Sequence, residues 1–405
     1  LVFNWGEELA RFAPQLKVSL IAGSQSERQA KLQTYSDFDV LVTSYDLLKR
    51  DIDQYEEKEF LYQIIDEAQY IKNHGTQAAK AVKEIRSEFR LALTGTPVEN
   101  RLSELWSIFD FLMPGFLYSY EKFCKEIELP AVQYGNSEAM ERLQKMIRPF
   151  VLRRLKKDVL KDLPDKLEKD MFSPLESEQK ELYEAHTERL RLMLSMQTDA
   201  EFKTSKLQIL SEITRLRQLC CYPGLVYENY KGNSSKLDMC MELVQNAVNG
   251  GHKILLFSQF TTMLDELAAR LKKAKISFYM LTGATSKEKR AQLVKAFNRD
   301  ETSVFCISLK AGGTGLNLTA ADIVIHYDPW WNLAVQNQAT DRAHRIGQKN
   351  VVSVYRLFMK DTIEERIRAL QEMKRELADE ILSGEGIGQA LISREEVLEL
   401  LGKRE

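Results

Sequence analysis

The stretch IIDEAQYIKN, residues 64–73, places two adjacent carboxylates, Asp66 and Glu67, directly after an apolar run. A carboxylate pair at the end of a buried strand is a common way to hold Mg²⁺ beside a nucleotide phosphate. Asp66 would then coordinate the metal, and Glu67 would orient the attacking water. Acidic residues also favour the first turn of a helix, so an exposed helix start is an equally good explanation of the pair.

Such a pair normally works beside a phosphate-binding loop with the pattern G-x-x-x-x-G-K-[ST]. The sequence contains no Gly-Lys-Ser or Gly-Lys-Thr, and its only Gly-Lys, at 402–403, is followed by Arg404. The chain opens on Leu1, in the apolar run LVFNW, without an initiator methionine. We therefore expect the sequence to begin inside a domain.

Two loops that follow apolar runs combine glycine with threonine. In LTGTPVEN, residues 93–100, Thr94 and Thr96 flank Gly95, and their hydroxyls suit a phosphate contact, although an ordinary strand-to-helix turn explains the pattern better. In KAGGTGLNL, residues 310–318, three glycines in four positions allow the backbone to approach a ligand closely. A sharp turn is the alternative there, because a glycine-rich loop alone is a weak signal.

The segment NLAVQNQATDRAHRIGQK, residues 332–349, carries the strongest local signal. Asn332 can cap a helix and Gly347 can end it, with an apolar face made of Val335, Ala339, Ala343 and Ile346. Helical spacing then places three polar side chains beside that face: Gln338, Arg342 and Arg345. Two arginines there suit an arginine finger that clamps a phosphate. A salt-bridged surface helix is the alternative, although only Asp341 is acidic in this stretch.

Two further segments each have two open interpretations. YDPWW, residues 327–331, places two adjacent tryptophans, Trp330 and Trp331, after an apolar run. A tryptophan there suits a base or phosphate platform or, equally, a hydrophobic contact. Residues 148–164 form the densest basic patch of the chain, with Arg148, Arg153, Arg154, Lys156, Lys157 and Lys161. Contact with a phosphate backbone is one interpretation of this patch, and a solvated helix face, the more usual case, is the other.

The apolar runs indicate elements that can position these loops. In residues 1–108, the runs KVSLIAG, FDVLVTSY, LYQIID and FRLALTG are typical of buried parallel strands, with helical spacing between them. Residues 109–229 change to long charged helices, including one expected over 138–160, and strand signals are few. Residues 230–360 return to alternating strands and helices, with HKILLFS, ISFYMLTG, SVFCISL, DIVIHYD and VVSVYRLFM as strands.

Helix starts and the end of the chain complete this organisation. Thr285-x-x-Glu288 and Thr362-x-x-Glu365 have the spacing of capping boxes, and residues 361–405 are expected to continue as a long amphipathic helix. Ligands of open α/β sheets bind at the carboxyl ends of the strands. The loops described above therefore lie where chemistry is expected.

Composition limits the classes of partner. The 405 residues include 57 Lys and Arg and 59 Asp and Glu, for a net charge of -2, so any nucleic-acid contact must come from local basic patches. The 5 cysteines, with no C-x-x-C, disfavour a disulfide framework or a zinc site and fit a reducing compartment. No apolar run approaches membrane-spanning length, and we expect no membrane contact.

The order of the loops is more specific than any one of them. DEAQ, LTGTP, ILLFSQF, AGGTGLNL and QATDRAHRIGQ follow one another along the chain. Together with ENRLSELWSIFDFLMPGF (99–116) and FVLRRLKKDVLKDLPDK (150–166), this order resembles the helicase-like ATPase motor of the SWI/SNF-type remodeller family. The resemblance covers nearly the whole chain. Generic helicases of the wider superfamily share this general order of loops, but they lack the segments RAHRIGQ and LRRLKKDV.

The resemblance implies an α/β fold with two RecA-like lobes, 1–108 and 230–360, each built on a parallel sheet. A helical insertion, 109–229, would lie between them, and a brace helix, 361–405, would follow. The family binds ATP and Mg²⁺ between the lobes and double-stranded DNA across them. Asp66 and Glu67 match its motif for Mg²⁺ and water, and Arg342 and Arg345 match its arginine finger.

Other positions follow from the same resemblance. The expected nucleotide contacts are Thr94, Gly313, Gly315 and Gln338. The expected DNA contacts are Thr43, Ser44, Ser258, Gln259, Thr314, Asn317 and Trp331. Leu333 stands where the family usually has proline. The family's phosphate-binding loop precedes the run LVFNW, so we expect it upstream of residue 1 and expect this chain to be inactive alone.

We therefore expect the motor of an ATP-dependent double-stranded DNA translocase that does not separate strands. A DNA-bound protein is the further expected partner, and the expected compartment is the cytoplasm or nucleoid, or the nucleus in a eukaryote. Two alternatives stay open: a non-catalytic DNA-binding module, and a helicase that remodels RNA or separates strands. Comparing the stimulation of ATP turnover by duplex DNA, single-stranded DNA and RNA separates these alternatives.

Overall fold

The computed structural model describes residues 1–95, 102–133, 136–154, 156–160, 162–312, 316–372 and 401. Two compact units are present, the first covering Leu1–Val151 and the second beginning at Leu152. The chain passes from one unit to the other inside 109–229, the segment expected to form one helical insertion. Its first part packs with the first unit and the rest with the second, so the two halves of the segment belong to different cores.

The second unit is built on one parallel sheet of six strands in the order β5-β10-β9-β6-β8-β7. The strands are β5 Lys166–Ser173, β6 Ile254–Ser258, β7 Phe278–Leu281, β8 Val304–Ser308, β9 Ile323–His326 and β10 Val352–Met359. All five apolar runs expected to be strands in 230–360 are strands. The predicted α/β class with a parallel sheet is confirmed.

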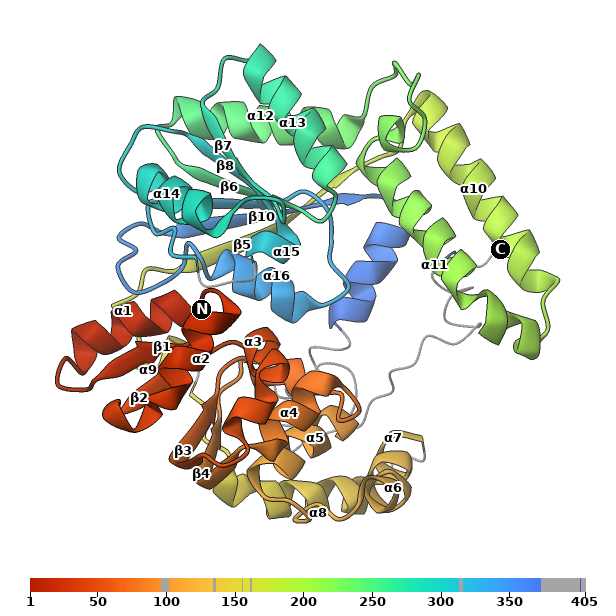
Figure 1. Ribbon diagram of the computed structural model, residues 1–405. Coiled ribbons are helices and arrows are strands. Elements are labelled where there is room, and N and C mark those ends of the chain that lie inside the picture. Colours follow the sequence, from red (N-terminus) through yellow and green to blue (C-terminus); the bar gives the residue numbers. More distant parts are fainter. Residues whose placement is uncertain are drawn as a thin grey trace. The chain divides into compact units, whose positions relative to one another are not determined.

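Helices cover both faces of this sheet (Figure 1). The helices are α12 Ser235–Asn249, α13 Thr261–Lys273, α14 Lys287–Phe297, α15 Leu309–Gly312 and α16 Leu333–Thr340. In β6, Ile254 and Leu256 pack in one core with residues of α12 and α13. Leu255 and Phe257 pack in the other, with residues of α14 and α16. Because side chains alternate along a strand and both faces are buried, every position is apolar and the strand reads as a continuous apolar run.

β5 lies in a stretch where few strands were expected. It pairs with β10 in parallel, from Lys166 opposite Val352 to Ser173 opposite Met359. β5 is an edge strand with one neighbour, and its residues, KLEKDMFS, are largely polar and partly exposed. An edge strand needs less apolar surface than a central one, which explains why its sequence gives a weak strand signal.

Helices α9 Lys156–Val159, α10 Ser177–Ser195 and α11 Asp199–Cys221 complete the second unit. Residues 363–372 are also helical, and Ile363 and Ile367 are buried with α10 and α11 in a third core. This agrees with the start of the predicted brace helix. The rest of the predicted helix, 373–405, lies outside the described residues except for Leu401, which is buried in the same core.

The first unit contains two parallel strand pairs, β1 Val18–Leu20 with β2 Val40–Val42, and β3 Glu59–Ile65 with β4 Arg86–Ala92. Its helices are α1 Val2–Phe12, α2 Gln25–Gln33, α3 Tyr45–Arg50, α4 Gln77–Glu84, α5 Leu102–Leu112, α6 Tyr120–Phe123, α7 Leu129–Gln133 and α8 Ser137–Ile147. The four predicted strands are confirmed, but the expected burial of both faces is not found for β3 and β4. Tyr62 and Phe89 stack on each other at 5.1 Å between ring centres and are about half exposed.

Two details of the predicted helices are wrong. The long helix expected over 138–160 is broken, because α8 ends at Ile147, just before Arg148-Pro149, and a proline inside a helix removes a hydrogen bond and clashes with the preceding turn. The capping residue of α14 is Ser286, whose hydroxyl accepts the backbone N–H of Lys289. Thr285 instead accepts the backbone N–H of Thr282.

Among the described residues, no helix combines the length and apolarity that crossing a bilayer requires.

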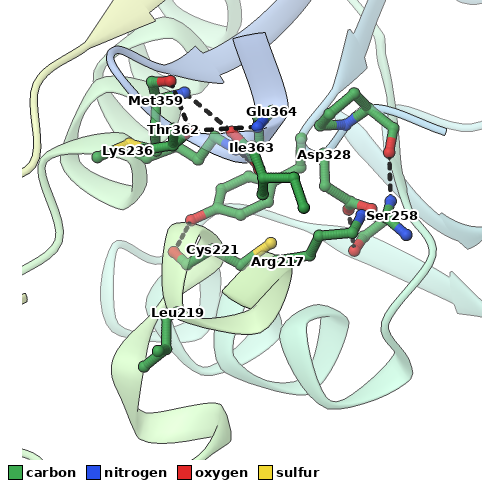
Figure 2. Close-up of polar contacts among 12 residues, drawn as sticks. Arg217, Leu219, Cys221, Lys236, Ser258, Asp328, Met359, Thr362, Ile363 and Glu364 are labelled. Atoms are coloured by element: carbon green, nitrogen blue, oxygen red, sulfur yellow. Dashed lines mark hydrogen bonds and ion pairs between the residues drawn. The ribbon is translucent and has the colours of Figure 1, made fainter. Parts of the chain in front are cut away.

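A fully buried ion pair joins α12 to the helix at 363–372. Lys236 Nζ donates to both carboxylate oxygens of Glu364 at 2.6 Å, and both side chains are 0% exposed (Figure 2). The carboxylate also accepts the backbone N–H of Met359 at 2.8 Å. Burial raises the pKa of Glu364. Burial also lowers the pKa of Lys236, but the Glu364 charge and neighbouring thiols outweigh it and raise this pKa overall.

We expect Glu364→Gln to lower the free energy of unfolding of the second unit by about 3–5 kcal/mol, because it leaves the Lys236 charge buried without its counter-charge. Chemical denaturation followed by circular dichroism measures the change. The matched control is Glu184→Gln in the exposed pair Lys180–Glu184, where the charges are 3.9 Å apart and little change is expected. Equal effects of the two substitutions would contradict the expectation.

Candidate functional site

The predicted carboxylate pair lies directly after β3. Asp66 Oδ1 accepts the backbone N–H of Glu67 at 2.8 Å, and Oδ2 accepts the indole N–H of Trp5 at 2.9 Å. Glu67 has left-handed backbone angles, φ 52° and ψ 52°, a conformation that costs a non-glycine residue ~1–3 kcal/mol and is frequent at functional sites. Only a short 3-10 turn follows, Ala68–Ile71, without a side-chain cap from Glu67. This geometry disfavours the helix-start explanation.

The donor set around Asp66 fits a magnesium ion shared with a nucleotide. Among the described residues, no group of three or more His, Cys, Asp or Glu side chains is placed to hold a metal. Mg²⁺ commonly uses one or two carboxylates and completes its octahedral shell with water and phosphate oxygens. The partly buried Asp66 and Glu67 therefore suit such a shared ion and do not suit an all-protein metal cage.

A hydrogen-bond chain links Glu67 to the loop after β4. Gln69 Nε2 donates to Glu67 Oε2 at 2.6 Å, and Thr94 Oγ1 donates to Gln69 Oε1 at 2.8 Å. The backbone N–H of Ala68 also donates to Leu93 O at 2.9 Å. The parallel register of β3 and β4 brings their carboxyl ends to the same edge. The predicted residues Glu67 and Thr94 are thus brought together, and Gln69, to which sequence reasoning assigned no role, is the link.

The loop after β2 joins the same region through a tyrosine. Tyr45 donates its hydroxyl to the backbone O of Asp66 at 2.7 Å. Burial, with help from the Asp66 charge, raises the pKa of this phenol above its ordinary value. The predicted DNA contacts Thr43 and Ser44 precede it. The Thr43 hydroxyl donates to Ile21 O at 3.3 Å, and the Ser44 hydroxyl caps α3, so both hydroxyls have local partners.

In the second unit, the loop after β6 is held by a buried carboxylate. Ser258 is 0% exposed and donates its hydroxyl to Asp328 Oδ1 at 2.5 Å. The backbone N–H of Gln259 lies 3.3 Å from both Asp328 oxygens. The Ser258 side chain is therefore engaged inside the fold, and its burial does not agree with a direct DNA contact. Gln259 is partly exposed, which leaves it as the candidate contact of this loop.

The arginine segment differs from its predicted form. Asn332 caps α16 as expected, accepting the N–H of Ala334 at 2.9 Å, and Gln338 lies on this helix, partly exposed. However, α16 ends at Thr340, so Arg342 and Arg345 lie in the following turns and do not share a helical face with Gln338. Of the predicted apolar face, Ile346 is 78% exposed.

Hydrogen bonds from neighbouring segments engage the residues at and just after the end of α16. The N–H of Leu318 donates to Arg342 O at 3.0 Å, taking the carbonyl that a continuing helix would offer to residue 346. The Thr340 hydroxyl is hydrogen-bonded to the buried His326 of β9 at 2.8 Å. Burial lowers the pKa of His326 to about 3, so this imidazole is neutral.

The same turns contact the segment that follows the glycine-rich loop. Arg345 Nη1 donates to Leu316 O at 3.4 Å, and Asn317, a predicted DNA contact, is exposed beside it. Arg342 is only 4% exposed, whereas Arg345 is partly exposed. The predicted contacts Gly313, Thr314 and Gly315 lie outside the described residues. The structure thus brings the arginines near 316–318, a proximity that helical spacing alone did not indicate.

Part of the basic patch packs against the arginine segment. Lys156 Nζ lies 2.6 Å from Asp341 Oδ1 and donates to His344 O at 3.3 Å. The His344 ring is hydrogen-bonded to Pro164 O at 2.8 Å. Arg148, Arg153 and Arg154 are exposed. Lys156 therefore pairs with the acidic residue of the arginine segment, a role that neither interpretation of the patch included.

Trp331 packs against the third core, which contains residues of α10 and α11. The guanidinium carbon of Arg217 lies 5.5 Å from the centre of its ring. This environment supports the hydrophobic interpretation of Trp331, while its predicted contact with DNA stays a prediction.

Two families match the sequence in succession. The SNF2-related domain family matches residues 1–225, and the helicase conserved C-terminal domain family matches residues 235–347. An uncharacterized ATP-dependent helicase of Mycoplasma pneumoniae is 39% identical over 99% of this chain and 38% of its own length. The human SWI/SNF-related matrix-associated actin-dependent regulator of chromatin subfamily A member 1 is 35% identical over 98% of this chain and 40% of its own length.

Among solved structures, the Sulfolobus solfataricus SWI2/SNF2 ATPase core in complex with dsDNA is 38% identical. The match covers 94% of this chain and 80% of that one, with a TM-score of 0.47. The chain spans about 40% of the length of the two relatives above. Its first 225 residues match the SNF2-related domain and the helicase domain follows; the chain therefore belongs to the SNF2-related family of helicase-like proteins.

Proposed function

We propose that this chain supplies the ATPase motor of a double-stranded DNA translocase of the remodeller type. The observation that carries the proposal is the hydrogen-bond chain from Glu67 through Gln69 to Thr94. It fixes an acidic residue in a strained conformation at the carboxyl end of a parallel strand pair. Such a residue suits the activation of water beside a nucleotide phosphate.

In this proposal, the residues of the first unit have separate roles in binding the metal and in orienting water. Asp66 would hold Mg²⁺, which when bound would offset negative charge on the phosphate oxygens. Trp5 and the backbone N–H of Glu67 orient the Asp66 carboxylate. Glu67 accepts a hydrogen bond from the attacking water and aligns it, and Gln69 keeps the Glu67 side chain in place.

In the second unit, two arginines are candidates for a phosphate contact. Arg345 is the better candidate for a direct phosphate contact, because it is partly exposed and its hydrogen bond to Leu316 O, at 3.4 Å, is long. Arg342 is nearly buried, and its backbone O holds Leu318. We assign it the role of shaping the turn that presents Arg345.

Contacts with DNA are proposed for exposed or partly exposed loop residues at the carboxyl ends of strands. Gln259 and Asn317 are the candidates in the second unit, and the Thr43-Ser44 loop is the candidate in the first. Hydrolysis of ATP would drive stepwise movement along the phosphates of duplex DNA. Proteins bound to that DNA are the proposed cargo.

The test is ATP turnover by a protein that carries this sequence. Because the printed sequence has no Gly-Lys-Ser or Gly-Lys-Thr, a fusion that places a relative's phosphate-binding loop before residue 1 is assayed in parallel. We expect duplex DNA to raise kcat at least about tenfold more than single-stranded DNA or RNA, a difference of about 1.4 kcal/mol in activation free energy. A preference for single strands or RNA would contradict the translocase proposal and favour a helicase.

A further inference from the structure

Four charged side chains, which we call the buried charge cluster, lie inside the second unit: Arg217, Lys236, Asp328 and Glu364. Each is less than 5% exposed. Figure 2 shows Lys236 joined to Glu364, and Asp328 facing Ser258 with Arg217 close by. The Lys236–Glu364 pair connects two helices. Asp328 instead turns toward the loop after β6, although it takes no part in the reaction proposed above.

Asp328 accepts hydrogen bonds from two groups at the start of that loop. Its carboxylate accepts the Ser258 hydroxyl at 2.5 Å and the N–H of Gln259 at 3.3 Å. The Ser258 oxygen in turn accepts the N–H of Phe260 at 3.2 Å. Phe260 precedes α13, whose first turn has no side-chain cap from it. The backbone over 258–260 is therefore held by one carboxylate, directly or through Ser258.

Arg217 contacts the same loop and also the loop after β9. It lies on α11, and its Nη2 donates to the backbone O of Pro329, the residue after Asp328. Its guanidinium carbon is 5.8 Å from the centre of the Phe260 ring and 5.5 Å from that of Trp331. Burial raises the pKa of Asp328, and the charge of Arg217 opposes that shift. Arg217 thus ties the loop after β6 and the loop after β9 to α11.

The side chain of Gln259 has an unused donor. Its Nε2 is a buried atom with no hydrogen-bond partner among the described residues, an unfavourable state that a rotation toward an acceptor would relieve. The backbone N–H of the same residue is fixed by Asp328. The backbone of the loop is therefore fixed. The side-chain amide of Gln259 would gain a hydrogen bond by turning outward to an anionic oxygen.

We propose that Asp328 is a positioning residue that sets the Ser258–Phe260 loop so that the amide of Gln259 meets a phosphate oxygen of duplex DNA, and that Arg217 fixes this loop to α11. The inference rests on the proposed DNA function and deepens it. It names a carboxylate that supports DNA binding from inside the fold. It also makes α11 a route by which the helical segment acts on the DNA contact.

Charge makes the effect of Asp328→Asn diagnostic. Asparagine removes one negative charge, and by electrostatics alone that change strengthens binding to the DNA polyanion. Asparagine keeps one acceptor for Ser258, but its amide NH₂ replaces the second acceptor and turns a donor toward the N–H of Gln259. If Asp328→Asn binds DNA more weakly, the charge change cannot be the cause. Weaker binding would therefore indicate that the loop geometry is lost.

The experiment titrates a fluorescent duplex with the chain itself by anisotropy at several salt concentrations. For Asp328→Asn we expect Kd to rise about tenfold at each salt concentration, with the slope of log Kobs against log salt little changed, because a neutral amide that contacts a phosphate releases no counterion. The matched control is Asp238→Asn, the same charge change at an exposed position of α12, which should bind no more weakly than the unchanged chain. Stoichiometric titration gives the active fraction of each variant.

Arg217→Lys is the second variant, because Asp328→Asn leaves a changed polar group in the core and can impair folding. Lysine keeps the positive charge but loses the guanidinium that lies over the rings of Phe260 and Trp331, and we expect a higher Kd. If the Asp328→Asn variant does not fold, the Kd of Arg217→Lys alone tests the inference. A reduced active fraction with an unchanged Kd in the folded variants would mean a purely structural role and would overturn the inference.

The inference and the DNA function can fail separately. If Gln259→Ala weakens binding of the duplex but neither Asp328→Asn nor Arg217→Lys does, the positioning inference is wrong and the DNA function stands. If the unchanged chain does not bind duplex DNA, both are wrong.

Discussion

Replacing Glu67 with glutamine is expected to lower kcat for ATP by about 100-fold or more while nucleotide affinity changes little, because a positioned general base contributes about 10²–10⁴-fold to a rate. Glutamine has nearly the same shape, and its amide oxygen still accepts the hydrogen bond that Gln69 donates at 2.6 Å. The hydrogen-bond chain to Thr94 therefore persists. What is lost is the negative charge that aligns the water and accepts its proton.

The measurement pairs steady-state turnover in saturating duplex DNA with equilibrium binding of a fluorescent nucleotide. Glu59→Gln is the matched control, since Glu59 is exposed at the other end of the same strand and lies away from the loop. It should leave kcat unchanged. An unchanged kcat in Glu67→Gln would remove Glu67 from the role of water activation. A parallel loss of nucleotide affinity would instead indicate that the charge serves binding.

The positions of the strands could be predicted well from sequence, for a physical reason. Central strands of a parallel sheet are buried on both faces, so runs such as ILLFS in β6 and VFCIS in β8 are apolar throughout. The sequence of β5 is not apolar throughout, because β5 is an edge strand with one partner. The acidic pair at 66–67 was found because it directly follows such a run.

The partners of the candidate residues could not be predicted, because they are distant in sequence. Trp5 and Asp66 are 61 positions apart, and Ser258 and Asp328 are 70 apart. The second pair meets only because Phe257 is opposite His326 in the register of β6 and β9, and that register is a tertiary property.

Helical periodicity failed at the arginines for a related reason. The apolar spacing continued past Thr340, but the helix ends there, and Leu318 and His326 hydrogen-bond to Arg342 O and to the Thr340 hydroxyl. A local pattern describes only what a segment favours alone. The competing partners of Arg342 O and of the Thr340 hydroxyl come from other elements, so tertiary contacts override the propensity.

Replacing Arg345 with alanine is expected to reduce kcat by about 1,000-fold or more, because an arginine that stabilises the transition state of phosphoryl transfer contributes about 10³–10⁵-fold. Nucleotide binding should persist, since charge on the transferring phosphate develops in the transition state. Turnover and fluorescent-nucleotide binding are measured as for Glu67. Arg299→Ala is the matched control, an exposed arginine of the same unit that should retain full activity.

The exposure of the two arginines distinguishes a residue that contacts phosphate from one that supports the fold. Arg345 is partly exposed with one long hydrogen bond, whereas Arg342 is 4% exposed, so Arg342→Ala should lower the unfolding temperature and Arg345→Ala should not. Arg345→Lys sharpens the test, because lysine keeps the charge but loses the two-pronged geometry that suits a phosphate. If lysine restores most of the turnover, charge alone suffices. If binding fails together with turnover in Arg345→Ala, the arginine holds the ground state and is not a finger.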